Sequence, residues 1–334
     1  MISCLRGAGV DVVEEHVSVW EGVRDGWSAG PRRALKLLEA EARLATRRPQ
    51  GFDAFIVGYP GHFDLPAANR AAGDAPVIFN PLVSLADTLV ADRRRFRAAS
   101  LPARTFESID RLAFNAADLV VADTQAQARL FADLAGLDVV ETCFVGAEDR
   151  LFRPTWRPPD RFTALFVGKL IPLHGVETIL AAAALAPEIH FRVVGSGQLS
   201  RLLAERPPNV DHVPWIEYEL LPAEIADAGC ALGIFGTTPK AARVIPNKAF
   251  QALASAAPLV TADTPAAREL LVDGESALLV PAGDPQALAT AVRTLAADQE
   301  LSRRIAARGR ATYERRASEA VLGARWHGII ERLT

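Results

Sequence analysis

The chain has 334 residues, enough for two domains, and its 50% hydrophobic and 23% charged residues are ordinary for a globular protein. Its net charge of -3 gives no general attraction to nucleic acid, and the signatures of DNA- and RNA-binding modules are missing. No C-x-x-C pair and no membrane-length apolar run occurs, so we expect a cytoplasmic protein without a zinc knuckle; its three cysteines are Cys4, Cys143 and Cys230.

The first 150 residues contain apolar, β-rich runs separated by stretches of helical periodicity. In chain order the runs are VDVVEEHVSVW, FDAFIVGY, APVIFN, DLVVAD and VVETCFV. This alternation predicts βαβ units with a parallel sheet. The opening MISCLRGAG resembles the end of a helix, before which a doubly wound domain normally has a central first strand. We therefore expect residues 1–150 to form a Rossmann-like, acceptor-side domain that lacks its first strand, in a truncated chain.

A second set of runs follows: TALFVG, IHFRVVG, NVDHVP, CALGIF, PLVTAD and SALLVP. Between the two sets lies GAEDRLFRPTWRPPDRF, whose prolines and scattered charges are typical of a linker. The sequence thus predicts the α/β class, with two doubly wound domains facing a cleft where ligands bind at strand C-termini. We assign residues 151–315 to the second domain and 316–334 to a helix that packs back on the first.

The turn FVGKLIPLHG indicates an anion site. Gly168 ends an apolar run, so the backbone can approach an anion closely, and the helix that follows offers unpaired N–H groups. Lys169 and His174 add a charge or a donor. An ordinary strand-to-helix turn with one lysine has the same pattern, and the two interpretations are about equally probable.

A second stretch, PKAARVIPNKAF, favours the anion site. Lys240 and Arg243 lie in the loop after a predicted strand, and Asn247 and Lys248 open a helix where N–H groups are unpaired. The chain has only four lysines, and three of them fall in these two loops. Because lysine acts as a compact point charge for phosphate, this distribution favours binding of a diphosphate over a merely solvated surface.

Residues 160–315 resemble the group 1 retaining glycosyltransferases of GT-B fold. FVGKLIPLHGVETIL is similar to that family's strand, G-[RK]-L and K-G turn and helix, with His174 where a lysine is usual. The turn containing Gly195 and Gly197 in RVVGSGQL, and Trp215 in VPWIEYELL, match its I-V-G-x-G-P-L and G-W-V motifs. QALASAAPLVTADTPAARELLVDGESALLVPAGD follows its E-A-x-A-x-G-x-P-V-V motif and continuation.

The departures from the family pattern concern its paired glutamates. These two acids, eight residues apart, would fall on Arg243 and Gln251. Gln251 can still hydrogen-bond ribose hydroxyls, whereas Arg243 cannot replace a carboxylate but can hold phosphate together with Lys240. These changes favour nucleotide-sugar binding over efficient catalysis.

The resemblance implies an enzyme, a hexosyltransferase-like glycosyltransferase that moves a sugar from a nucleotide-sugar to an acceptor hydroxyl. The acceptor would be a glycan, a lipid-linked molecule or a small molecule. Lys169 and Lys248 would stabilise the leaving diphosphate. No D-x-D motif occurs, so we expect neither a metal nor another cofactor. The alternatives are a weak or inactive nucleotide-sugar-binding relative and a GT-B nucleotide-sugar epimerase.

Two further residues and one segment are candidates. Glu269 aligns with a family acid near the donor sugar, although a lone helical glutamate is more often solvated. His62 follows a predicted strand and would face the cleft, although a structural loop histidine is slightly favoured. DRRRFRAASLPAR, residues 92–104, is either a peripheral contact with anionic membrane at the inner face or, twice as probably, a solvated helix surface.

Overall fold

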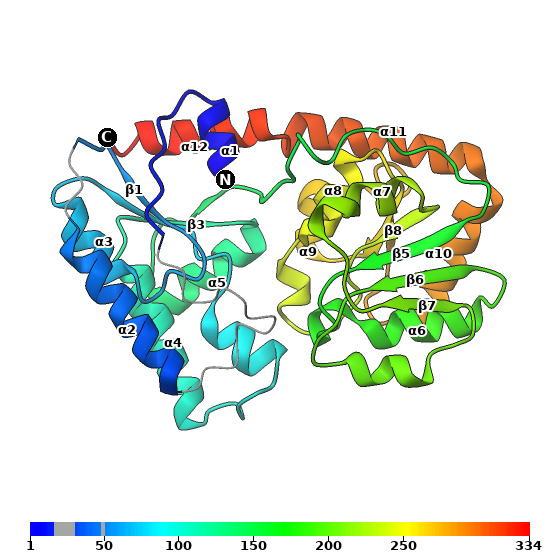
Figure 1. Cartoon of the computed structure of the whole chain (residues 1–334), viewed down its shortest axis with the longest axis horizontal. Coiled ribbons are helices and arrows are strands. Elements are labelled where there is room, and N and C mark those ends of the chain that lie inside the picture. Colours follow the sequence, from blue (N-terminus) through cyan, green and yellow to red (C-terminus); the bar gives the residue numbers. More distant parts are fainter. Residues whose placement is uncertain (17–30, 48–50) are drawn as a thin grey trace.

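A computed structural model describes residues 1–16, 31–47 and 51–334, and shows two domains (Figure 1). The N-terminal domain contains, in chain order, α1 (Ile2–Gly7), α2 (Pro31–Thr46), β1 (Phe55–Val57), α3 (Leu65–Ala72), β2 (Val77–Phe79), the π-helix η1 (Asp87–Asp92), α4 (Leu101–Asn115), β3 (Leu119–Ala122), α5 (Gln125–Ala135) and β4 (Glu141–Thr142).

The N-terminal sheet has the strand order β1-β2-β3-β4, and all its pairs are parallel. Strands β1, β2 and β3 are apolar because helices cover both faces of the sheet. On one face Phe79 packs with Phe114 of α4 and Phe131 of α5. The N-terminal domain is therefore a parallel α/β unit, as predicted, although one of its predicted strands is wrong. In the run that begins at Val10, residues 10–16 form no strand, and residues 17–20 lie outside the described residues.

The C-terminal domain follows a segment without helix or strand between Thr142 and Thr163. It contains, in chain order, β5 (Thr163–Val167), η2 (Pro172–His174), α6 (Val176–Leu185), β6 (His190–Val194), η3 (Ser200–Glu205), β7 (Val210–Val213), η4 (Tyr218–Leu220), α7 (Leu221–Ala226), β8 (Cys230–Leu232), η5 (Ala241–Arg243), α8 (Asn247–Ala254), β9 (Leu259–Ala262), α9 (Pro265–Leu270), β10 (Leu278–Val280), α10 (Pro285–Ala297) and α11 (Gln299–Arg316), and α12 (Glu319–Glu331) follows it.

The C-terminal sheet has the strand order β10-β9-β8-β5-β6-β7, again with parallel pairs. The chain starts in the middle, at β5, builds one side with β6 and β7, and then crosses to β8 on the other side. The strand order therefore reverses between β5 and β8, and ligands of such sheets bind beyond the strand C-termini at this reversal. The loops after β5, β6 and β8 contain the glycines and lysines that the sequence indicates.

The last helix, α12, covers the second face of the N-terminal sheet (Figure 1). Trp326 and Ile329 are buried against Ile78 of β2 and Val121 of β3. Gly323 lets α1 pack closely, since a Cβ there would collide with the carbonyl oxygen of Cys4. The N-terminal domain is thus completed by a helix that follows the C-terminal domain in sequence. No helix in the described ranges is both long and apolar enough to cross a bilayer.

Candidate functional site

The loops after β5 and β6 are in backbone contact. Gly168 N donates to Val194 O at 2.9 Å, and Leu170 N donates to Ser196 O at 3.1 Å. Gly195 has φ +136°, and a Cβ at this position would collide with the carbonyl oxygen of Gly168. Only glycine fits there, so the two loops form one compact surface at the C-terminal edge of the sheet.

His174 and Lys248 meet beside Gly168. The Lys248 Nζ lies 3.3 Å from His174 Nε2 and 4.7 Å from the centroid of the Phe166 ring. A Cβ on Gly168 would lie 3.0 Å from Nζ and 3.2 Å from His174 Cε1. The His174 Nδ1 is hydrogen-bonded to the carbonyl oxygen of Lys169. The structure therefore brings four of the predicted site residues together.

Burial controls the charge of this pair. It lowers the pKa of Lys248 to about 7. Burial, and then the nearby Lys248 charge, holds the pKa of His174 well below its ordinary value of 6.5. Arg93 of the N-terminal domain acts on His174 in the same direction. An anion bound at this position would favour the protonated, positively charged form of both groups.

The remaining residues predicted around this turn differ in exposure. Lys169 and Asn247 have exposed side chains, and Asn247 is the first residue of α8. Gly197 approaches the Leu170 backbone so closely that a Cβ would lie 2.7 Å from its carbonyl oxygen. Gln251 is buried and interacts with the Tyr218 hydroxyl. Trp215 is 62% exposed, so its indole is accessible to a ligand.

Lys240 and Arg243 contact the N-terminal domain. Lys240 Nζ donates to Thr88 Oγ1 at 2.6 Å, and Arg243 Nη2 donates to Asp87 Oδ1 at 2.5 Å. Lys240 is buried, which lowers the pKa of its ammonium, and Asp87 and Asp92 counteract that shift. In this structure the two residues link the domains. Their positive charges are compensated by residues of the N-terminal domain, so they need no phosphate as a partner.

Glu269 occupies the N-terminus of helix α5, across the domain boundary. Its two carboxylate oxygens accept hydrogen bonds from the backbone N–H groups of Gln125, at 2.7 Å, and Ala126, at 2.8 Å. These N–H groups lack partners within the helix, and a negative charge is favourable at this end of the helix dipole. Glu269 thus joins α9 to α5 rather than projecting freely into solvent.

Replacing Glu269 with alanine is expected to weaken the domain contact. Loss of this charged cap should lower the free energy of unfolding by about 1–2 kcal/mol. Urea unfolding measures the change. Glu269→Gln, which keeps an acceptor, should lose less, and Glu275→Ala, at an exposed ion pair with Arg308, should stay near the wild-type value. Equal stability of all four proteins would contradict a capping role.

His62 does not face the domain boundary. Its side chain and that of Asp110 are fully enclosed, with His62 Nε2 3.1 Å from Asp110 Oδ1. The ring packs edge-on against Phe79 at 5.1 Å, and its Nδ1 lies 2.8 Å from the Pro60 carbonyl oxygen. The expectation that His62 faces the cleft is therefore wrong, because a carboxylate and two rings of the N-terminal core enclose it.

Two polar residues near the site were not singled out from the sequence. Asp123 follows β3, and burial raises the pKa of its carboxyl to about 7. Arg93 lies beside the glycine loops, since its carbonyl oxygen accepts a hydrogen bond from Gln198 Nε2 at 3.2 Å. The acid directly after the buried run LVVA was the available signal for Asp123. Arg93 lies within residues 92–104, for which the sequence predicted only a membrane contact or a solvated helix surface.

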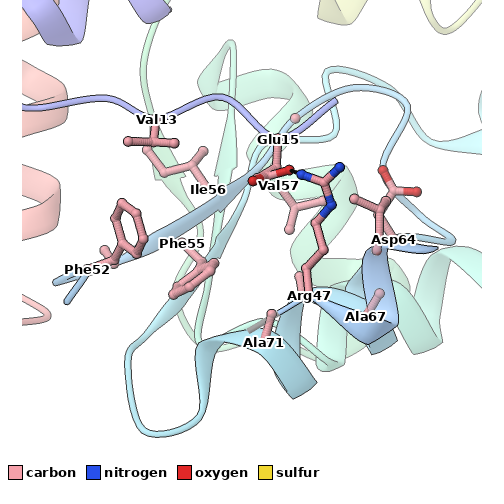
Figure 2. Close-up of a pocket in the computed structure, with 14 residues that line it drawn as sticks. Val13, Glu15, Arg47, Phe52, Phe55, Ile56, Val57, Asp64, Ala67 and Ala71 are labelled. Carbon is pink, nitrogen blue, oxygen red and sulfur yellow. Dashed lines mark hydrogen bonds and ion pairs between the residues drawn. The ribbon is translucent and has the colours of Figure 1, made fainter. Parts of the chain in front are cut away.

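A cavity of about 230 Å³ lies along β1 in the N-terminal domain (Figure 2). Phe52 and Phe55 contribute apolar walls, and the ion pair of Glu15 with Arg47 contributes a polar one. None of the residues predicted for the site lines it. Within the described ranges, no group of three or more His, Cys, Asp and Glu side chains is arranged to hold a metal ion.

Comparison with known proteins relates the C-terminal domain to one family. Residues 161–298 match the family described as "Glycosyl transferases group 1". A phosphatidyl-myo-inositol mannosyltransferase of Mycobacterium leprae (strain TN) is 31% identical over 157 residues, which are 44% of this chain and 40% of that protein. A D-inositol 3-phosphate glycosyltransferase of Nocardioides sp. (strain ATCC BAA-499 / JS614) is 28% identical over 228 residues, 58% and 49% of the two chains. The chain thus spans half or less of the length of these relatives.

Solved structures establish the fold across both domains. Sucrose-phosphate synthase from Thermosynechococcus elongatus superposes with a TM-score of 0.72, at 19% identity, over 90% of this chain and 78% of that one. Anabaena HepE, solved in complex with UDP-glucose, gives a TM-score of 0.69 at 17% identity, over 91% and 84% of the two chains. Residues 161–298 therefore match the group 1 glycosyltransferases, within a chain that has the GT-B fold.

Proposed function

We propose that this protein transfers a sugar from a nucleotide-sugar to an acceptor hydroxyl. The observation that carries the proposal is the pair of His174 and Lys248, packed against Gly168 at the point where the sheet order reverses. The relatives named above are a mannosyltransferase and a glycosyltransferase, and HepE binds UDP-glucose. We infer that the donor's diphosphate lies against this pair.

In the proposed reaction, the bond between the anomeric carbon and the diphosphate oxygen breaks, and its electron pair stays on the diphosphate. The acceptor oxygen forms the new bond to the same carbon, and its proton passes to the leaving diphosphate oxygen. Lys248, with the N–H groups of the α8 N-terminus, stabilises the growing negative charge. We propose that transfer proceeds with retention and without a metal.

Donor hydrolysis tests this proposal without a known acceptor. Purified protein is incubated with UDP-, GDP- and dTDP-sugars, with and without EDTA, and the released nucleotide and sugar are measured. Slow release of nucleotide diphosphate that EDTA does not reduce is expected. Binding without any release would favour an inactive relative, and conversion of the donor to another nucleotide-sugar would favour an epimerase. Complete inhibition by EDTA would overturn metal independence.

We further propose that the basic segment of residues 92–104 contacts an anionic membrane, at the inner face of the cytoplasmic membrane. Its arginines at 94, 97 and 104 are exposed, and Leu101 is 80% exposed beside them. Cationic and apolar side chains on one exposed segment are typical of interfacial binding. A lipid-linked acceptor would then be presented next to Arg93, and so next to the site.

Vesicle sedimentation is the test of membrane contact. The protein should bind vesicles that contain phosphatidylglycerol and not vesicles of phosphatidylcholine alone. Reversing Arg94 and Arg97 to glutamate should weaken binding at least about tenfold, because each basic residue near an anionic surface contributes about 1 kcal/mol. Arg315→Glu, on α11 of the other domain, is the matched control. Equal binding by the double variant would overturn the contact.

A further inference from the structure

The contact between His174 and Lys248 joins two groups that are both cationic when protonated. Their nitrogens Nε2 and Nζ are 3.3 Å apart, with the Phe166 ring and Gly168 on their other sides. We propose that the pair shares its protons, so that a nucleotide diphosphate binds here together with protons from solvent, and that His174 positions Lys248. This inference rests on the proposed function.

The hydrogen bonds of His174 determine its tautomer. Its Nδ1 faces the carbonyl oxygen of Lys169, which can only accept, so Nδ1 carries the hydrogen. In the neutral ring, Nε2 is therefore an acceptor, and it accepts a hydrogen bond from Lys248 Nζ. A protonated ring would instead direct an N–H at the ammonium. The pair in the free protein consequently holds at most one positive charge.

The surroundings oppose a second charge. The charged groups that act most strongly on His174 are Lys248 on α8, Arg93 from the N-terminal domain and Lys169 in its own loop, all of them basic. Burial acts in the same direction on both members of the pair, with a pKa of about 7 for Lys248. Above neutral pH the free site therefore loses much of its positive charge.

A bound diphosphate restores the positive charge of the site, because its negative charge favours the protonated form of both groups. Binding at pH 8 then adds one proton to Lys248 and, to the extent that the anion reaches it, a second to His174. Both protons come from solvent. The terminal phosphate of UDP is already ionised at pH 8, since the last pKa of such groups lies near about 6. The protons taken up therefore go to the protein.

Titration calorimetry with UDP, and separately with GDP, counts these protons. Measurements at pH 8 in buffers of different ionisation enthalpy should show uptake of about one proton or more per nucleotide bound. The association constant should fall about tenfold for each pH unit between 7 and 9, as linkage requires for one proton. Binding without proton uptake, at an affinity independent of pH, would overturn the inference and leave the proposed function standing.

Three variants locate the effect. His174→Gln places an amide near the position of Nε2 and cannot be protonated, so nucleotide should still bind while uptake decreases to that of Lys248. His174→Asn is too short to reach Lys248, and affinity should fall about tenfold. His327→Gln, at an exposed histidine on α12, should match the wild type. Wild-type affinity and uptake in both His174 variants would exclude His174. Failure of both nucleotides to bind the wild type would overturn the proposed function, and the inference with it.

Discussion

The Lys248→Ala variant is expected to transfer or hydrolyse the donor about 10² to 10³ times more slowly than the wild type, a loss of about 2.7–4 kcal/mol of transition-state stabilisation by analogy with oxyanion-hole donors. Lys248 is the side-chain cation held between the glycine loop and the Phe166 ring, where no carboxylate contacts its Nζ within the described ranges. Initial rates at saturating donor measure the effect. Lys36→Ala, at an exposed lysine on α2, is the control and should keep full activity.

Replacing Lys248 is expected to increase the stability of the protein, although it decreases the activity. The pKa of Lys248, about 7 against an ordinary 10.5, means that the folded state disfavours the charged form. This cost is fully present below pH 7 and disappears as the pH rises toward 10.5. Lys248→Met should therefore raise the free energy of unfolding by about 1–3 kcal/mol at pH 6, and by less at pH 9. A variant that is both inactive and less stable at pH 6 would contradict this account of the site.

The second large effect is expected for Gly195→Ala. The added Cβ would collide with the Gly168 carbonyl oxygen, and φ of +136° is accessible essentially only to glycine. Because the obstacle is backbone, the two loops must separate. The free energy of unfolding should fall by more than about 4 kcal/mol, or the loops should lose their nucleotide affinity where the fold survives. Urea unfolding and UDP titration together distinguish these outcomes.

Gly274→Ala is the matched control for this substitution. Gly274 also has positive φ, at +68°, but a Cβ there has no neighbour within 4 Å. It should lose only the roughly 1–2 kcal/mol that left-handed backbone costs a residue with a side chain. Similar losses at both positions would mean that backbone conformation, and not the contact between the glycine loops, decides the result.

The glycine and lysine positions of the site could be predicted because each depends on the local sequence pattern of a strand followed by a turn or a helix. Gly168 and Gly195 directly follow buried strands, and Lys248 lies in the first turn of a helix after another strand. Parallel strands bring their C-termini to one edge, so such residues meet whatever their distance in sequence. The two-domain α/β fold was predictable for the same reason, since alternating strand and helix patterns are local.

The roles of Lys240, Arg243 and Glu269 could not be predicted in this way. Their partners lie 152, 156 and 143–144 residues away in the other domain, where no pattern in the sequence links them. The sequence around a basic loop residue is the same whether that residue binds a phosphate or forms an ion pair with an aspartate. The prediction for His62 was wrong for a related reason. A histidine that follows a strand faces the core or the cleft according to the conformation of the loop that contains it.

The position of α12 has a consequence for biosynthesis. Leu322, Trp326 and Ile329 fill the face of the N-terminal sheet formed by Ile78 and Val121, and they are translated after the whole C-terminal domain. Domains usually fold in the order in which they leave the ribosome, but here part of one apolar face of the first sheet stays uncovered until about the last fifteen of the described residues emerge. Nascent chains stalled before α12 should therefore recruit chaperones through the first domain even after the second has folded.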